Sequence, residues 1–82
     1  ISYQDYLASG NGATQLYSGT LNVDPILGGS LSIFDSVETF TDNGDGTLTG
    51  DMGGTGTINY TTGAWSVDFN ANVAAGDNIY AI

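Results

Sequence analysis

Hydrophobic and polar residues alternate along most of the chain with a period of two, which is typical of β-strands with one buried face. The clearest case lies between positions 53 and 69. There, apolar Ile58 and Tyr60 alternate with Thr57 and Asn59 on the first arm. The apolar positions of the second arm are Trp65, Val67 and Phe69. The pattern predicts a β-hairpin around which the other strands pack.

The residues between the two arms predict the type of turn. Thr61-Thr62-Gly63 suits a short loop that is closed by a glycine in the left-handed region. Other segments with strand-like alternation are 13–23, 30–41, 47–49 and 78–82, and Asp35-Ser36 divides the second of them into two short strands or one bulged strand. Turn signals separate these segments every eight to twelve residues, and none has a helical period. We therefore expect an all-β domain.

This domain is expected to be a small antiparallel β-sandwich or barrel of six to seven short strands. It would be a single domain over residues 1–82, with an N-terminal arm at 1–12 and the sandwich or barrel at 13–82. The residues that we expect in the core are Leu31, Ile33, Ile58, Tyr60, Trp65, Val67, Phe69 and Ile79. Those that we expect at an interface are Tyr3, Tyr6, Leu7, Tyr17 and Tyr80. A sugar-binding platform is an alternative role for the aromatic residues, but their phasing favours the core.

The charge of the chain narrows the classes of partner. The 82 residues include nine Asp and Glu and no Lys, Arg or His, which gives a net charge of −9. Such a chain repels nucleic acid and anionic membranes, so we expect neither as a partner. The absence of Cys and His excludes disulfides and a Cys/His zinc site. We expect the acidic residues on a water-facing surface, in loops or at polar strand positions: Asp35, Glu38, Asp42, Asp45, Asp51, Asp68 and Asp77.

Catalysis is not expected from this set of side chains. Without His, Cys or Lys, only carboxylates, hydroxyls and phenols remain for acid–base or nucleophilic roles. Two carboxylates can hydrolyse a glycosidic bond, but a chain of this length has little room for a cleft that would raise the pKa of one of them. We therefore predict a protein that is not an enzyme.

The segment from Thr41 to Gly46, TDNGDG, is similar to part of a calcium loop of the D-x-N-x-D-G type. The ligand candidates are Asn43, Asp45 and Asp51. The match is incomplete, because Thr41 stands where the loop needs Asp and Met52 stands where it needs Glu. Asn-Gly and Asp-Gly also form turns without any ion. A plain turn is the favoured interpretation and a calcium site is the alternative; no other cofactor is expected.

Several short motifs follow one another in a fixed order along the chain. They are Thr47-Leu48-Thr49-Gly50, then Gly56 to Ala64 (GTINYTTGA), Phe69, Ala74-Ala75-Gly76 and Ile79, with Gly10 to Thr20 (GNGATQLYSGT) as the opening. In this order they resemble a small β domain of tailed-bacteriophage virion proteins, including capsid decoration (cement) proteins and components of tails and baseplates. The chain departs from that domain at Asn72-Val73, where a Pro is common, and in having no basic residue.

The resemblance implies a non-enzymatic structural protein on the outer, extracellular surface of a virion. Its partners would be the major capsid protein or other virion proteins, and it would be a homo-oligomer, such as a trimer, on a symmetric particle. A capsid decoration protein is the first interpretation, with the Tyr-rich arm at 1–7 as a clamp. The alternatives are a tail, baseplate or fibre module, a secreted adhesin or carbohydrate-binding module, and a subunit of an extracellular filament.

Overall fold

A computed structural model of the chain describes residues 5–21, 29 and 31–82. In this part of the chain there are eight β-strands and no helix, and accordingly no helix that could cross a membrane. The strands are β1 (Asp5–Ser9), β2 (Leu16–Thr20), β3 (Ser32–Phe34), β4 (Thr39–Asp42), β5 (Thr47–Gly50), β6 (Thr55–Ile58), β7 (Ala64–Asp68) and β8 (Asn78–Ala81).

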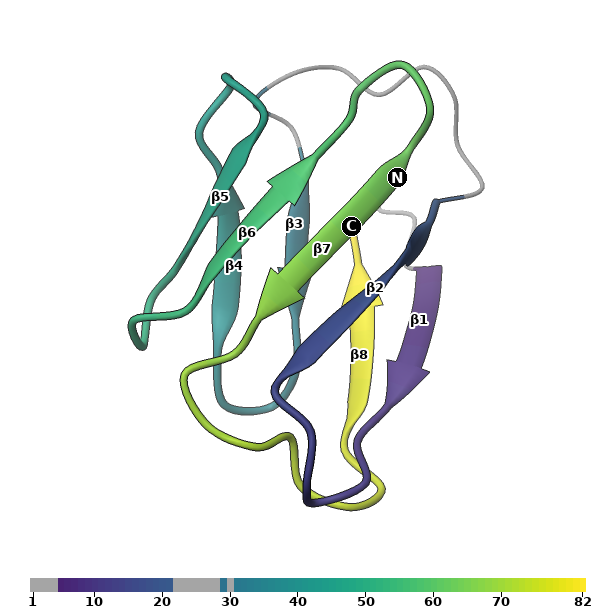
Figure 1. The fold of residues 1–82 in the computed structure, drawn as a ribbon, viewed down its shortest axis with the longest axis vertical. Helices are drawn as coiled ribbons and strands as arrows, with labels where there is room; N and C mark the ends of the chain where they lie inside the picture. The colour runs from purple at the N-terminus through teal and green to yellow at the C-terminus, as the bar shows by residue number, and fades with distance from the viewer. Residues whose placement is uncertain (1–4, 22–28, 30) are drawn as a thin grey trace.

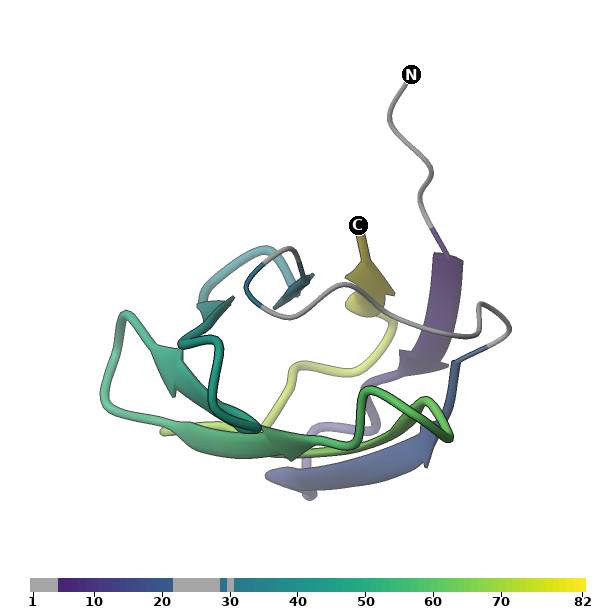
Figure 2. The same ribbon diagram turned by 90° about the horizontal axis from the view of Figure 1, so that it is seen from above.

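All eight strands belong to one antiparallel sheet with the order β1-β8-β3-β4-β5-β6-β7-β2 (Figure 1). Strands β3 to β7 follow one another as a meander, whereas β8 returns to lie between β1 and β3. The sheet curves around an interior to give a nearly closed, barrel-like roll (Figure 2). Strands β1 and β2 are neighbours in sequence but lie at the two ends of this order. The segment between them therefore crosses one end of the roll.

The all-β, antiparallel prediction is confirmed, and the choice between sandwich and barrel resolves to a single rolled sheet. The structure has one strand more than the six to seven expected. The additional strand is β1, which lies in the segment 1–12 that was expected to be an arm. It pairs with β8 through Tyr6 and Tyr80, and a shift in register lies between Tyr6 and Ala8. This irregularity hides the period of two in the sequence.

The core fills the interior of the roll. All the residues that the sequence placed there are buried except Tyr60, which is half-buried and packs against the others. Phe40 and Phe69 meet edge to face with their ring centres 4.9 Å apart. Such a pair adds about 0.5–1.5 kcal/mol to the effect of burial alone. Among the residues that the structure describes, the core consists of Leu21, Leu31, Ile33, Phe40, Leu48, Ile58, Trp65, Val67, Phe69, Val73, Ile79 and Ala81.

The turn between β6 and β7 has the predicted left-handed glycine. Gly63 has a φ of 80°, and its N–H donates to the Asn59 carbonyl over 2.8 Å. The side chain of Asn59 accepts hydrogen bonds from the N–H groups of Thr61 and Thr62. Beyond the turn, the N–H of Leu21 donates to the Gly63 carbonyl over 2.9 Å. The hairpin turn is thus tied to the segment that follows β2.

Replacing Gly63 with alanine is expected to lower the free energy of unfolding by about 2 kcal/mol. About half of this loss comes from the positive φ, and the rest comes from a new Cβ that would lie 3.0 Å from the Leu21 carbonyl oxygen. Gly44 is a matched control, because its φ is 85° but a Cβ there would meet nothing within 4 Å. Urea denaturation of both variants measures the difference. Equal losses would mean that contact with Leu21 contributes nothing.

Candidate functional site

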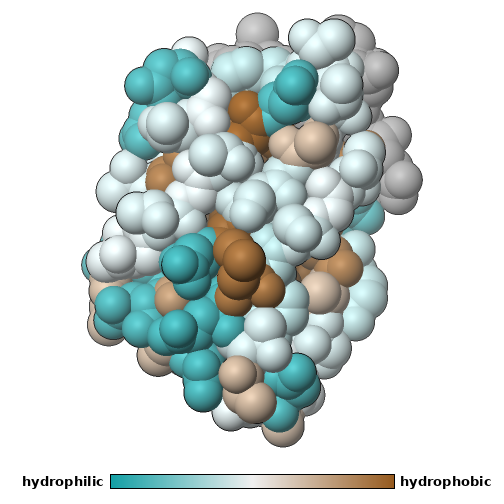
Figure 3. Space-filling view, in the orientation of Figure 1, coloured by the Kyte–Doolittle hydropathy of each residue, from teal (hydrophilic) through white to brown (hydrophobic). Residues whose placement is uncertain are grey.

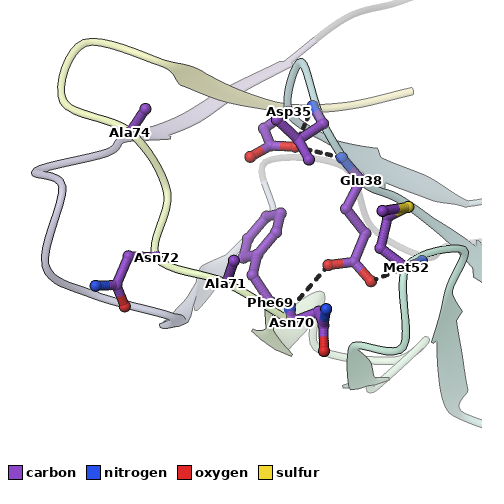
Figure 4. A pocket seen from close by; sticks show the side chains of 9 residues that line it. Asp35, Glu38, Met52, Phe69, Asn70, Ala71, Asn72 and Ala74 are labelled. Atoms are coloured by element: carbon purple, nitrogen blue, oxygen red, sulfur yellow. Dashed lines mark hydrogen bonds between the residues drawn. The ribbon is translucent and has the colours of Figure 1, made fainter.

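A pocket of about 150 Å³ opens at one end of the roll. Three segments that are far apart in sequence form its walls: the β3–β4 turn, the β5–β6 turn and the loop that follows β7 (Figure 4). Its surface is mostly apolar. The residues that line it are Asp35, Val37, Glu38, Met52, Phe69, Asn70, Ala71, Asn72 and Ala74.

Glu38 is the side chain that joins these three segments. Only 3% of it is exposed, and its carboxylate accepts three backbone hydrogen bonds. Oε2 accepts from the N–H groups of Met52 (3.1 Å) and Gly54 (2.7 Å), and Oε1 accepts from that of Asn70 (2.9 Å). No cationic side chain exists in the chain to compensate the charge. Backbone dipoles therefore take the place that a buried salt bridge usually fills.

Two glycines leave the room that this carboxylate needs. A Cβ on Gly50 would overlap Oε2 of Glu38. A Cβ on Gly54 would lie 2.8 Å from the same oxygen and 2.7 Å from the ring of Phe40. The glycine-rich sequence at 50–56 thus allows the β5–β6 turn to close directly on the glutamate.

The rim of the pocket carries two exposed apolar side chains. Val37 is 64% exposed and Met52 is 53% exposed. The turn that presents Val37 is fixed by Asp35, whose Oδ1 accepts from the N–H groups of Val37 (2.9 Å) and Glu38 (2.7 Å). Asp77 also holds this turn, since it accepts from the hydroxyl of Ser36 over 2.7 Å. The rim is therefore held in place by hydrogen bonds before any partner binds.

A second buried carboxylate lies at the other end of β4. Among the described residues, Asp42 accepts four hydrogen bonds, from the Tyr60 hydroxyl (2.6 Å) and from the N–H groups of Gly29, Gly44 and Leu31. Burial alone would raise the pKa of Asp42, but the four hydrogen bonds together outweigh it and lower the pKa below the usual 3.8. The hydrogen bond from the Tyr60 hydroxyl to Asp42 also raises the pKa of Tyr60 above its usual 10.0, because the carboxylate holds the hydroxyl proton.

The expectation that the acidic residues face water is wrong for Asp35, Glu38 and Asp42, which are buried. Glu38 and Asp42 lie two residues before and after Phe40, so all three side chains point to the inner face of the roll. This shared parity is visible in the sequence, but it does not by itself predict burial, because a buried carboxylate normally needs a cation and the chain has none.

The structure does not bring the three calcium candidates together. Asp45 and Asp51 lie beyond opposite ends of β5, on either side of its four residues. Asp45 accepts from the N–H and hydroxyl of Thr47, which lower its pKa, and Asn43 donates to Thr47 and Thr49. Asp51 accepts from the N–H of Thr39. In the described part of the chain, no three acidic side chains are grouped to hold a metal ion. The segment is a hydrogen-bonded turn.

Two of the expected interface residues do meet on the outside of the sheet. Tyr6, Tyr80 and Phe34 occupy matching positions on β1, β8 and β3, and we call them the aromatic row. The ring centres are 6.1 Å apart between Tyr6 and Tyr80 and 6.0 Å apart between Tyr80 and Phe34. Tyr6 is 55% exposed. On the face drawn in Figure 3, hydrophobic residues form small areas among hydrophilic and neutral ones.

The other expected interface residues lie elsewhere. Leu7 and Tyr17 are half-buried and pack against the core, because Leu7 falls at the irregularity in β1 and Tyr17 shares the inward parity of β2. The ring of Tyr17 meets that of Phe69 edge to face. Tyr3 lies outside the described residues. Sequence reasoning missed Val37 and Met52, for which no periodic signal exists, since both occur in turns.

The chain matches no family model, no curated protein and no solved structure. The features that bear on its function are therefore the pocket, the aromatic row, the charge of the chain and the order of its turn motifs.

Proposed function

We propose that this chain is a non-enzymatic structural protein of a virion, which binds the outside of a phage capsid lattice and stabilises it. The observation that supports this most directly is the pocket with its rim of Val37 and Met52, at the end of a small, hydrogen-bonded roll. Exposed apolar side chains around a partly open apolar pocket are typical of a protein-binding surface. The order of turn motifs along the chain, which resembles phage virion domains, supplies the class of partner.

The state of the buried acids supports a structural role over a catalytic one. Glu38, Asp42 and Asp35 each accept at least two backbone hydrogen bonds, so they serve to close turns. A pair of acids for glycoside hydrolysis needs one carboxyl group that holds its proton near neutral pH. The lowered pKa of Asp42 excludes this residue as that proton donor. On the lattice, several copies, such as a trimer, would bind at equivalent positions.

Co-sedimentation with capsids tests this function. Expanded capsids without decoration protein, from the phage whose genome carries the coding sequence, are mixed with the purified chain. Saturable binding at a fixed ratio to capsid subunits, and a higher melting temperature of the capsids, are expected. Binding to purified tails in place of capsids would favour the tail or baseplate function. Binding to neither particle would contradict a virion role.

Glycan binding is a second candidate function, because the aromatic row gives the sheet an apolar strip on its outer face. The planes of neighbouring rings are inclined by 69° and 38°, so the row is twisted and suits a single curved chain better than a flat crystalline surface. A glycan array read with the unchanged chain and with Tyr6→Ala tests this alternative. Binding that disappears in the variant would support it, and an array without signal would count against it.

A further inference from the structure

We propose that the pocket binds one apolar side chain of a partner protein, presented on a segment that carries lysine or arginine beside it. This inference rests on the proposed function and names the chemistry of the contact that the function requires. It follows from three properties of the pocket: its size, the state of its polar groups and the charge around it.

The size of the pocket fits a single side chain. Its volume of about 150 Å³ equals that of engineered apolar cavities of about 150 Å³ that bind benzene. Phe69 is almost completely buried beneath it, and Val37 and Met52 stand exposed at its rim. An inserted aliphatic or aromatic side chain would remove these surfaces from water, and this burial is the main source of free energy at the centre of an interface.

The polar groups of the pocket do not require a polar ligand. Both oxygens of Glu38 already accept backbone hydrogen bonds, and Figure 4 shows them directed towards Asn70 and Met52. Oδ1 of Asp35 likewise accepts two backbone hydrogen bonds within its own turn. An apolar occupant leaves all these bonds intact.

The charge around the pocket identifies the rest of the partner. Asp35 and Glu38 line it, and two further acids are attached to its rim. Asp51 precedes Met52 and bonds to Thr39, while Asp77 bonds to Ser36, next to Val37. A second copy of the chain would bring another charge of −9 and no basic residue. Anionic lipid would be repelled in the same way, so the complementary partner is a basic segment of a different protein.

A blocked Lys-Leu-Lys tripeptide is the probe for this inference. Two-dimensional ¹H–¹⁵N NMR of the full chain should show shifts that saturate and are confined to Val37, Met52, Phe69, Asn70 and their neighbours. Blocked Lys-Ser-Lys and Glu-Leu-Glu tripeptides should bind at least tenfold more weakly, because each lacks one of the two required features. Raising the salt concentration to about 0.5 M should weaken Lys-Leu-Lys several-fold, since exposed charges are then screened.

Isosteric variants locate the contact. Val37→Thr and Met52→Gln replace exposed apolar groups by polar ones of the same shape, and each should lower the affinity for Lys-Leu-Lys at least threefold. Leu16→Asn is the matched control, because Leu16 is 60% exposed and does not line the pocket. It should bind the tripeptide like the unchanged chain. Thermal denaturation of all three variants verifies that they remain folded.

Two results would overturn the inference. The first is that Lys-Leu-Lys does not bind, or that it binds equally well to Val37→Thr, Met52→Gln and the unchanged chain. The other is equal binding of Lys-Ser-Lys, which would reduce the contact to charge alone.

The proposed function is judged separately by capsid co-sedimentation. If the chain pellets with capsids but the tripeptide does not bind, the function stands and docking uses another face. If the pocket binds the tripeptide but no virion particle binds the chain, the partner belongs to another assembly.

Discussion

Replacing Glu38 with glutamine is expected to lower the free energy of unfolding by about 3 kcal/mol. The substitution keeps the shape of the side chain but removes one of its two acceptor oxygens. The amide oxygen of glutamine can still accept from Met52 and Gly54, and its NH₂ group then faces the N–H of Asn70. One buried donor loses its partner, and the remaining bonds lose the assistance of a charge.

Urea denaturation at pH 7 measures this loss, and Asp51→Asn is the control. Asp51 is also an acid that accepts a backbone hydrogen bond, from Thr39 over 2.9 Å, but it is exposed. Its replacement should cost less than about 1 kcal/mol. If Glu38→Gln were no more destabilising than Asp51→Asn, the buried carboxylate would not be what holds the three segments together.

Hydrogen exchange provides a second measurement of the same effect. The amide protons of Met52, Gly54 and Asn70 are donors to Glu38, so their exchange should accelerate in Glu38→Gln beyond the change in global stability. The turn at Gly63, at a distant position in the chain, should change only with global stability. The pocket is therefore expected to loosen before the roll unfolds.

The hairpin and the core were predictable from local sequence. The alternation from Ile58 to Phe69 defines both strands β6 and β7, and a glycine at position 63 specifies the turn between them. Each of these signals depends on residues within a few positions of one another. Strand pairing then follows from burial of the common apolar face.

Strand β1 and the burial of three acidic residues were not predictable from local sequence. The irregularity at Leu7 breaks the period of two, so the sequence of β1 resembles an arm. The inward direction of Glu38 follows from its parity with Phe40, but its partners lie 14 to 32 residues further along the chain. No local pattern indicates that the N–H groups of Met52, Gly54 and Asn70 converge on one point.

The walls of the pocket, like the partners of Glu38, are far apart in the sequence and meet only in the folded sheet. These walls come from two turns at the same end of the meander and from the loop that leads from β7 into β8. Val37 and Met52 are ordinary turn residues in the sequence, and only the folded sheet places them around one opening. Residues in strands are thus easier to assign from sequence than those in turns, and the candidate site is made mainly of turns.

Glu38 and Asp42 together explain how a chain without cations can bury negative charge. They stand just before and at the end of β4, and each fixes turns by accepting backbone N–H groups. Three of the donors are glycines: Gly29 and Gly44 have positive φ values, and Gly54 has no Cβ to clash with Glu38. These three glycines are therefore linked to the burial of the two carboxylates.

Replacing Asp42 with asparagine is expected to lower the free energy of unfolding by about 2–3 kcal/mol at pH 7. Asparagine offers one acceptor oxygen where the carboxylate serves four donors, so the hydroxyl of Tyr60 or some of the N–H groups lose their partner. Asp45→Asn is the control within the same turn, because Asp45 is exposed and accepts hydrogen bonds from its neighbour Thr47. It should be clearly less destabilising.

The effect of Asp42→Asn should also depend on pH. The pKa of Asp42 in the folded state lies below the value of 3.8 expected when the chain is unfolded. The folded state therefore binds fewer protons in this window, and the ionised carboxylate adds stability that is fully present above about pH 4. As the pH falls through the folded-state pKa, this contribution is lost. The difference between the unchanged chain and Asp42→Asn should thus be constant from pH 5 to 8 and shrink below about pH 4.

Tyr60→Phe separates the hydroxyl of Tyr60 from the other partners of Asp42. It removes one of four donors, so its cost should be smaller than that of Asp42→Asn. It should also move the acid transition to higher pH, because the pKa of Asp42 rises.

At high pH, the raised pKa of Tyr60 predicts a contribution to stability that is present below pH 10 and is lost as the pH rises through the folded-state pKa. This alkaline loss should be weaker in Tyr60→Phe. A difference between Asp42→Asn and the unchanged chain that persists undiminished at pH 2 would mean that packing, and not the ionised carboxylate, determines the effect.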